Sequence, residues 1–193
     1  MILYLHGFRS SPHSLKARLI GERMYALGRA DDYRCPQLPA SPAAAIALAR
    51  QQLDRIDSST VTLVGSSLGG YYATWLAEQL GCRAVLLNPA IHPARDLHQH
   101  VGVSTHYHTE APFEFKVDYV AELQELAIER ITQPSRYLLL AATGDEVLDW
   151  HEMVAHYPGA QQHVIAGGDH GISDFAAYLD EVMAFCNHAP ESR

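Results

Sequence analysis

A serine stands at the centre of the Gly-Ser-Ser-Leu-Gly segment at residues 65–69. An apolar, β-branched run precedes this segment, and a helix-compatible segment at 71–80 follows it at once. A serine held on a sharp turn between a strand and a helix projects its hydroxyl above the edge of a parallel sheet. The turn needs residues without a Cβ because the two backbones approach closely, and Gly65 and Gly69 meet that need. Ser67 is therefore the candidate nucleophile.

Two further segments supply the partners that such a serine needs. A serine hydroxyl is a poor nucleophile at neutral pH and requires a base within hydrogen-bonding distance. His170 follows the last predicted strand and is the candidate base. An imidazole in turn needs a carboxylate that fixes its tautomer, and Asp145 follows the preceding strand. The chain order Ser67, Asp145, His170 is the order expected of α/β-hydrolases.

Some neighbouring residues remain alternatives for these roles. Glu146 and Asp149 could replace Asp145, which is preferred because it comes first after its strand and glycine. Asp169 is a possible helper of the adjacent histidine. His6 is interpreted as a structural residue that holds the neighbouring loop by hydrogen bonding. The serine pattern alone also suits a loop that only turns the chain or holds a phosphate, so the assignment depends on the three residues occurring together.

Acyl transfer also requires donors for the oxyanion of a tetrahedral intermediate. The residue after the nucleophile supplies one backbone N–H, which here is that of Leu68. The loop after the first strand supplies the other, and Phe8 is the candidate. Gly7 allows that backbone to come close to the substrate. Loss of one such donor costs about 3–4 kcal/mol in characterised enzymes.

The elements that must position these residues are strands that alternate with helices. The predicted strands are Ile2–Leu5, Tyr33–Cys35, Val61–Gly65, Arg83–Leu87, Tyr137–Ala142 and His163–Ile165. The predicted helices run from Ser14 to about Leu27, from Ser41 to about Ile56, and over 71–80, 150–157 and 175–186. Such alternation predicts a three-layer α/β/α fold with six parallel strands in the order 2-1-3-4-5-6. The loops at the carboxyl ends of these strands share one edge, where active sites form.

Residues 88–133 interrupt this alternation. The segment is polar, contains several prolines and histidines, and includes one predicted helix at 120–131. A long segment without strands of the main sheet commonly covers an active site or forms a binding loop. We therefore expect a single domain over residues 1–193, with a small cap-like insertion at about 88–133 and a frayed tail at 187–193.

Composition limits the classes of partner. The net charge of −8 and the absence of a basic run disfavour nucleic acid and anionic membrane surfaces. The three cysteines are scattered singly and form neither a disulfide framework nor a paired metal motif. No apolar run approaches the ~20 residues that a membrane span needs. The N-terminus lacks the pattern of a signal peptide, so a cytoplasmic location is expected.

Twelve histidines raise the question of a metal site. Five of them cluster in the insertion, namely His92, His98, His100, His106 and His108. Structural zinc sites usually combine tighter spacing with cysteines, and no His-Glu-x-x-His motif occurs. We therefore expect no metal, and interpret these histidines as solvated residues that tune a response to pH.

Five motifs together resemble one known family. They are Ile-Leu-Tyr-Leu-His-Gly-Phe-Arg-Ser-Ser-Pro at 2–12, Gly-Ser-Ser-Leu-Gly-Gly-Tyr-Tyr-Ala at 65–73, Asn-Pro-Ala at 88–90, Thr-Gly-Asp-Glu-Val-Leu-Asp at 143–149 and Gly-Gly-Asp-His at 167–170. This combination, which spans nearly the whole chain, resembles the YqiA/YcfP family of small bacterial α/β-hydrolase-fold proteins, and YqiA-type esterases most closely.

The resemblance implies a fold that lacks the first two strands of larger α/β-hydrolases. It implies carboxylic-ester hydrolysis, with acyl-CoA thioesters as a further substrate class. It places the nucleophile on Ser67, the acid on Asp145 and the base on His170. It leaves open whether Arg9, in the oxyanion loop, steers an anionic substrate or only contacts solvent.

The residues and the resemblance together predict a serine esterase. It would cleave small-molecule carboxylic esters through an acyl-enzyme, and it would need no cofactor. An acyl-CoA thioesterase, a non-catalytic binding scaffold with the same fold, and a metal-dependent hydrolase are the alternatives. The scaffold is disfavoured because such proteins tend to lose a member of the triad. Phe113, Phe115 and Trp150 are candidates to line an apolar pocket, although such residues are more often ordinary packing residues.

Overall fold

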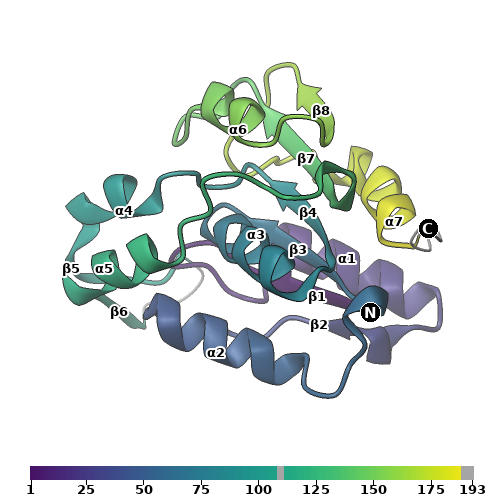
Figure 1. The fold of residues 1–193 in the computed structure, drawn as a ribbon, viewed down its shortest axis with the longest axis horizontal. Helices are drawn as coiled ribbons and strands as arrows, with labels where there is room; N and C mark the ends of the chain where they lie inside the picture. The colour runs from purple at the N-terminus through teal and green to yellow at the C-terminus, as the bar shows by residue number, and fades with distance from the viewer. Residues whose placement is uncertain (108–110, 188–193) are drawn as a thin grey trace.

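A parallel β-sheet forms the centre of the computed structural model, which describes residues 1–107 and 111–187. Its strand order is β2-β1-β3-β4-β7-β8 (Figure 1). The strands are β1 (Ile2–Leu5), β2 (Tyr33–Arg34), β3 (Thr62–Ser66), β4 (Arg83–Leu87), β7 (Tyr137–Ala142) and β8 (Gln161–Ile165). The order of these strands is the expected one once a separate hairpin, β5 and β6, which was not predicted, is left out of the numbering.

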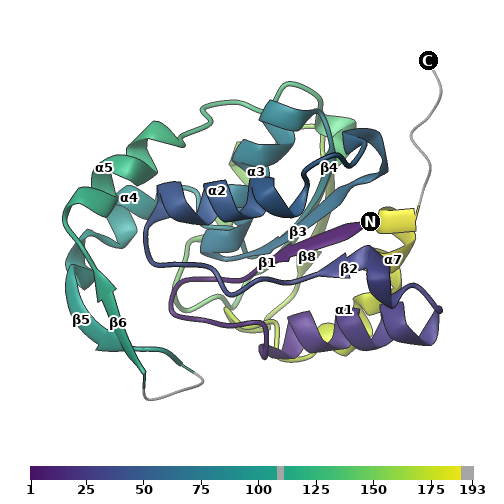
Figure 2. The same cartoon turned by 90° about the horizontal axis from the view of Figure 1, so that it is seen from below.

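Helices cover both faces of the sheet, which gives the expected three-layer α/β/α class (Figure 2). One face carries α1 (Leu15–Ala26) and α7 (Leu179–Asn187). The other carries α2 (Pro42–Gln52), α3 (Leu68–Leu80) and α6 (Trp150–His156). Successive strand side chains enter opposite layers, as period-two geometry requires. The central strands β1, β3, β4 and β7 are buried on both faces and mainly apolar, whereas the edge strands β2 and β8 are more polar and partly exposed.

Helix starts follow local capping chemistry only in part. The Ser41 hydroxyl accepts a hydrogen bond from the Ala44 N–H, and Pro42 occupies the first position of α2, as predicted. That helix ends at Gln52, earlier than expected. Ser14 precedes α1 without any side-chain hydrogen bond to the helix, so its predicted capping role was wrong.

Short 3₁₀ turns join several elements. They cover Ala30–Asp32, Ser58–Thr60, His98–His100, Pro134–Arg136 and Phe175–Ala177. The last of these replaces the first turn of the helix that was predicted at 175–186, and α7 begins only at Leu179. A 3₁₀ turn is a frequent connector next to an α-helix.

The predicted insertion contains regular structure that sequence reasoning missed. It comprises a short helix α4 (Pro93–Asp96), the antiparallel pair β5 (Gly102–Thr105) and β6 (Pro112–Phe115), and helix α5 (Asp118–Glu125). The helix expected at 120–131 therefore had the wrong bounds. The hairpin extends from one end of the molecule, beyond the ends of the main strands (Figure 2).

Two further observations concern the rest of the chain. No described helix is both long and apolar enough to cross a membrane. The three cysteines are free thiols, of which Cys82 is buried while Cys35 and Cys186 are partly buried. Apart from Asn187, the last residue of α7, the predicted frayed tail lies outside the described residues.

Candidate active site

Ser67 lies at the turn between β3 and α3, in a backbone conformation that few side chains adopt. Its φ is 55°, and α3 starts at the next residue. A Cβ on Gly65 would lie 2.3 Å from the Gly69 carbonyl oxygen, and one on Gly69 would lie 1.9 Å from the Leu5 oxygen. Neither distance is possible for real atoms, so the prediction that both positions require glycine is confirmed. The crowding explains how the turn holds a serine at positive φ.

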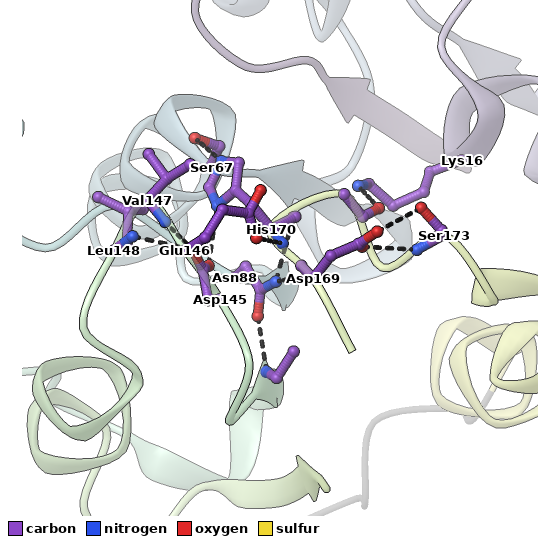
Figure 3. Close-up of polar contacts among 12 residues, drawn as sticks. Lys16, Ser67, Asn88, Asp145, Glu146, Val147, Leu148, Asp169, His170 and Ser173 are labelled. Atoms are coloured by element: carbon purple, nitrogen blue, oxygen red, sulfur yellow. Dashed lines mark hydrogen bonds and ion pairs between the residues drawn. The ribbon is translucent and has the colours of Figure 1, made fainter. Parts of the chain in front are cut away.

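A chain of two hydrogen bonds connects Ser67, His170 and Asp145 (Figure 3). His170 Nε2 lies 3.0 Å from Ser67 Oγ, and His170 Nδ1 lies 2.8 Å from Asp145 Oδ2. The three residues follow β3, β8 and β7 at the same edge of the sheet. An imidazole that donates its Nδ1 proton to a carboxylate presents Nε2 as an acceptor, which can take the hydroxyl proton.

The carboxylate of Asp145 is completely buried and fully engaged. Its side chain is 0% exposed, whereas that of His170 is 22% exposed. While Oδ2 meets the imidazole, Oδ1 accepts the backbone N–H groups of Val147 and Leu148, each at 2.8 Å. A buried charge is tolerated when it is paired and hydrogen-bonded in this way. These bonds fix the orientation of the carboxylate toward the ring.

The alternative carboxylates occupy other positions. Asp149 caps α6 by accepting the backbone N–H of His151, and it does not contact the candidate base. Glu146 accepts the backbone N–H of His170 at 2.9 Å and thereby holds the loop rather than the ring. Hydrogen bonds from the side chain and backbone of Ser173 lower the pKa of Asp169.

Asn88, at the end of β4, connects the end of β7 to the loop that carries His170. It is fully buried, with φ at 43°. Its Nδ2 donates to the carbonyl oxygens of Asp169 and His170, at 3.0 and 3.1 Å, and its Oδ1 accepts the Ala142 N–H at 2.8 Å. Sequence reasoning assigned no role to Asn88. Its position directly after an apolar strand, in an Asn-Pro pair, was the available signal.

The two candidate oxyanion donors flank the candidate nucleophile, Ser67. Among the described residues, neither the Phe8 N–H nor the Leu68 N–H has a hydrogen-bond acceptor. A Cβ placed on Gly7 would lie 3.2 Å from the Ser67 Cβ, so the backbone of this loop runs directly past the serine. Two free N–H groups beside a nucleophile are the arrangement that stabilises an oxyanion.

His6 fixes the start of the same loop. Its ring is 4% exposed; Nδ1 lies 3.0 Å from the Gly7 carbonyl oxygen, and Nε2 accepts the Leu38 N–H at 2.9 Å. The tautomer with a proton on Nδ1 satisfies both contacts. The expected structural role of His6 is therefore confirmed.

The β5–β6 hairpin holds the loop from the other side. The Phe8 ring packs edge-on against Phe113 and Phe115, with ring centroids 5.0 and 5.3 Å apart. The Arg9 guanidinium lies over the Tyr107 ring, 4.5 Å from its centroid, and the Arg9 carbonyl accepts the Tyr107 N–H. Arg9 thus attaches the loop after β1 to the hairpin.

A cavity of about 610 Å³ opens beside Ser67 and His170. Its wall includes Phe8 and Leu68, whose N–H groups are the candidate oxyanion donors, and Leu97 from the insertion. The volume suits a small organic ligand. Neither of the hairpin phenylalanines lines it, and Trp150 instead stacks on a neighbouring histidine.

The histidines of the insertion do not gather into a metal site within the part of the chain that the structure describes. No group of three or more His, Cys, Asp or Glu side chains there is arranged to hold a metal ion. His108 lies outside the described residues. His100 and His106 instead pack against the rings of Phe8 and Phe113.

Comparison with known proteins gives a family and a fold. A family model described as "Uncharacterised protein family (UPF0227)" matches residues 1–187. Among solved structures, a candidate hydrolase from Agrobacterium vitis S4 is 18% identical with a TM-score of 0.77, over 96% of this chain and 87% of its own.

Two further structures agree. Mouse alpha/beta hydrolase domain-containing protein 10 is 17% identical with a TM-score of 0.71, over 95% of this chain and 89% of its own. Est1E from Butyrivibrio proteoclasticus, with ferulic acid bound, is 16% identical with a TM-score of 0.65, over 95% and 87%. At these identities the likeness concerns the fold, which is that of the α/β-hydrolases.

Proposed function

The chain belongs to the uncharacterised protein family UPF0227, whose description names no activity, so we infer its function from the site. We propose that the protein is a serine hydrolase that cleaves carboxylic esters. The observation that carries this proposal is the continuous hydrogen-bonded series from the Ser67 hydroxyl through His170 to the buried Asp145. The esterases among proteins of the same fold, Est1E included, support it.

The proposed reaction starts with attack of the Ser67 hydroxyl oxygen on the ester carbonyl. His170 Nε2 takes the hydroxyl proton, and Asp145 stabilises the resulting imidazolium. The negative charge that develops on the carbonyl oxygen is accepted by the N–H groups of Phe8 and Leu68. Donors that are already oriented cost no reorganisation during the reaction, which is why they lower the barrier.

The second half of the cycle reuses the same groups. When the tetrahedral intermediate collapses, the carbon–oxygen bond to the alcohol breaks and His170 gives its proton to the leaving alkoxide. A water molecule, deprotonated by His170, then attacks the acyl-Ser67 ester and releases the acid. All the groups needed are protein groups, so we propose no cofactor. A cytoplasmic location and a single-domain organisation stay predictions from the sequence.

The test is covalent labelling by a fluorophosphonate, read by intact mass. We expect one adduct on the wild-type protein and none on Ser67→Ala. The matched control is Ser66→Ala, which removes the adjacent hydroxyl and should leave labelling in place. Full labelling of Ser67→Ala, or no adduct on folded wild type, would contradict the proposal.

An acyl-CoA thioesterase uses the same chemistry and remains the second candidate. The two activities are separated by comparing kcat/KM for an oxygen ester and a thioester of the same acyl group. A higher kcat/KM for the thioester would change the proposed substrate class from oxygen esters to thioesters, while Ser67, His170 and Asp145 would keep their proposed roles.

A further inference from the structure

The cavity beside Ser67 extends to the start of α1, where it is lined by three polar side chains. They are Tyr4 from β1, Lys16 from the first turn of α1, and Ser14, which directly precedes that helix. None of them takes part in the proposed acyl transfer. Figure 3 shows Lys16 on the far side of Asp169 from Ser67.

Lys16 is a buried cation whose ammonium is hydrogen-bonded to a backbone oxygen and not to a carboxylate of the described residues. Its side chain belongs to a residue that is 8% exposed, and no described carboxylate forms an ion pair with it. Its ammonium donates to the backbone oxygen of Gly171, which leaves two of its three donors unused. Burial lowers the pKa of Lys16 to about 8, although Asp169 and Asp145 act in the opposite direction. A buried ammonium with unused donors is costly, and a ligand that accepts hydrogen bonds from it would lower that cost.

Two buried hydroxyls line the same cavity as Lys16. Neither the Tyr4 nor the Ser14 hydroxyl makes a well-formed hydrogen bond with a described residue, although the side chains of Ser14 and Ser66 interact with the Tyr4 phenol. Tyr4 is fully buried, and burial raises the pKa of its phenol, which therefore stays a donor. Buried hydroxyls without partners are rare in folded proteins. Here the Tyr4 and Ser14 hydroxyls lie on the same cavity wall as the Lys16 ammonium.

The end of α1 adds a third source of positive potential. The first backbone N–H groups of a helix have no intrahelical acceptors, and the helix dipole places partial positive charge there. α1 has twelve residues, no acidic residue in its first turn, and no side-chain cap from Ser14. An uncapped helix end of this kind is suited to an anion.

We propose that the corner formed by Tyr4, Ser14 and Lys16 binds a carboxylate of the substrate, so that the preferred substrates are small esters that also carry a free carboxylate. This inference rests on the proposed hydrolase function and specifies its substrate class. Because the cavity also contains Ser67 and His170, one small molecule can reach both ends of it.

Two acidic residues on the same cavity wall do not oppose this assignment. Asp96 is paired with Arg95, and Glu146 accepts the backbone N–H of His170. Lys16 is the one lysine or arginine among the described residues that line the cavity. The cation of the cavity wall therefore lies at the start of α1, where the charges of Asp169 and Asp145 also act on it.

The test compares matched esters that differ in charge. For the acyl side the pair is 4-nitrophenyl monoadipate and 4-nitrophenyl hexanoate, which have acyl chains of equal length. For the alcohol side the pair is 3-acetoxybenzoate and 3-acetoxybenzamide. In at least one pair we expect kcat/KM to favour the anionic ester by about tenfold or more. Equal or lower kcat/KM for both anionic esters would overturn the proposal.

The variants assign that preference to Lys16. In Lys16→Met the ratio of kcat/KM between the anionic and the neutral ester should fall by about tenfold or more. Tyr4→Phe, which removes only a hydroxyl, should lower the same ratio by a smaller factor. Arg18→Met removes an exposed cation from the same helix and should keep the wild-type ratio. If Lys16→Met slows both esters equally, Lys16 only positions the Gly171 backbone, and the carboxylate site is refuted.

A binding experiment separates this proposal from the hydrolase proposal. Monomethyl adipate should raise the Tm of Ser67→Ala, which cannot form an acyl-enzyme, and should not raise that of Ser67→Ala/Lys16→Met. Stabilisation of the first protein alone supports the carboxylate site even if the wild type hydrolyses no ester. Equal stabilisation of both, or of neither, contradicts it.

Discussion

The Nδ2 atom of Asn88 lies 3.1 Å from the backbone carbonyl oxygen of His170. Through this bond the end of β4 holds the loop that carries the candidate base. The same side chain accepts the Ala142 N–H at the end of β7, just before the candidate acid. Asn88, which belongs to neither loop, therefore holds the loop of His170 close to the strand end that precedes Asp145.

Replacement of Asn88 should lower both stability and activity. Asn88→Ala leaves the Ala142 N–H and the His170 carbonyl without their partners, removes one of the two hydrogen bonds to the Asp169 carbonyl, and puts an alanine at positive φ. We expect a loss of about 2–4 kcal/mol in the free energy of unfolding, measured by urea denaturation. Asn88→Gly removes the same bonds but tolerates the backbone conformation, so it should lose less. Equal stability of wild type and both variants would contradict this account.

Asp145→Asn should abolish most activity while keeping the fold. The asparagine Oδ1 can still accept the N–H groups of Val147 and Leu148, but its amide donates to His170 Nδ1 and so favours a proton on Nε2. In that tautomer the ring cannot take the serine proton. We expect kcat to fall by roughly 10³–10⁴-fold, as in a serine protease that carries this substitution.

The control for that prediction is the alternative acid. Asp149→Asn changes an exposed cap of α6 and should leave kcat close to the wild-type value. The measurement is the rate at which each variant releases 4-nitrophenol from a 4-nitrophenyl ester. A larger loss in Asp149→Asn than in Asp145→Asn would reverse the assignment of the acid.

Gly69→Ala should destabilise the fold strongly. The new Cβ would lie 1.9 Å from the Leu5 carbonyl oxygen, so β1 and α3 would have to move apart. We expect a loss of more than about 3 kcal/mol in the free energy of unfolding. Gly28→Ala is the comparison, because φ at Gly28 is +70° and nothing lies within 4 Å of the new Cβ. It should cost only about 1–2 kcal/mol, from the backbone alone. Equal costs would show that contact with Leu5 is not the cause.

The preference for anionic esters should decrease as pH rises through about 8. Burial lowers the pKa of Lys16 to about 8, so its ammonium is present below that pH and is lost above it. The groups that face it are Asp145, Asp169, His170 and Tyr4; the Asp169 pKa is lowered and that of Tyr4 is raised, so neither changes charge near pH 8. The measurement is the ratio of kcat/KM between paired esters from about pH 6 to about pH 10.

This ratio isolates Lys16 because any effect of pH on the acyl-transfer chemistry itself acts on both esters of a pair. In Lys16→Met the ratio should be low at every pH. A wild-type ratio that stays constant across the range would exclude the Lys16 ammonium as its source.

The sequence predicted the main sheet and its order because the central strands are mainly apolar runs that alternate with helical segments. It also placed Ser67, Asp145 and His170 at one edge, since each lies in the turn or loop that follows a predicted strand, and the structure brings them within hydrogen-bonding distance. Their catalytic roles remain predictions. Local patterns were sufficient here because each residue's position depends mainly on the strand before it.

Asn88 and Lys16 could not be found in the same way. The hydrogen bond of Asn88 to His170 spans 82 positions of sequence, and that of Lys16 to Gly171 spans 155. Such contacts arise from tertiary packing, which local patterns do not encode. The hairpin was missed because β5 is mostly exposed, although the alternation in the Pro-Phe-Glu-Phe segment at 112–115 was a visible strand pattern.

The hairpin also has a thermal consequence for the proposed enzyme. It is an isolated antiparallel pair of four-residue strands, whereas the main sheet is buried under helices on both faces. A lone pair of this kind opens locally at a smaller free-energy cost than a central sheet. Since Phe8 packs against it, heating should release one oxyanion donor before the molecule unfolds. On heating, loss of activity would then precede global unfolding. Amide hydrogen exchange would be faster in the β5–β6 hairpin than in the main sheet.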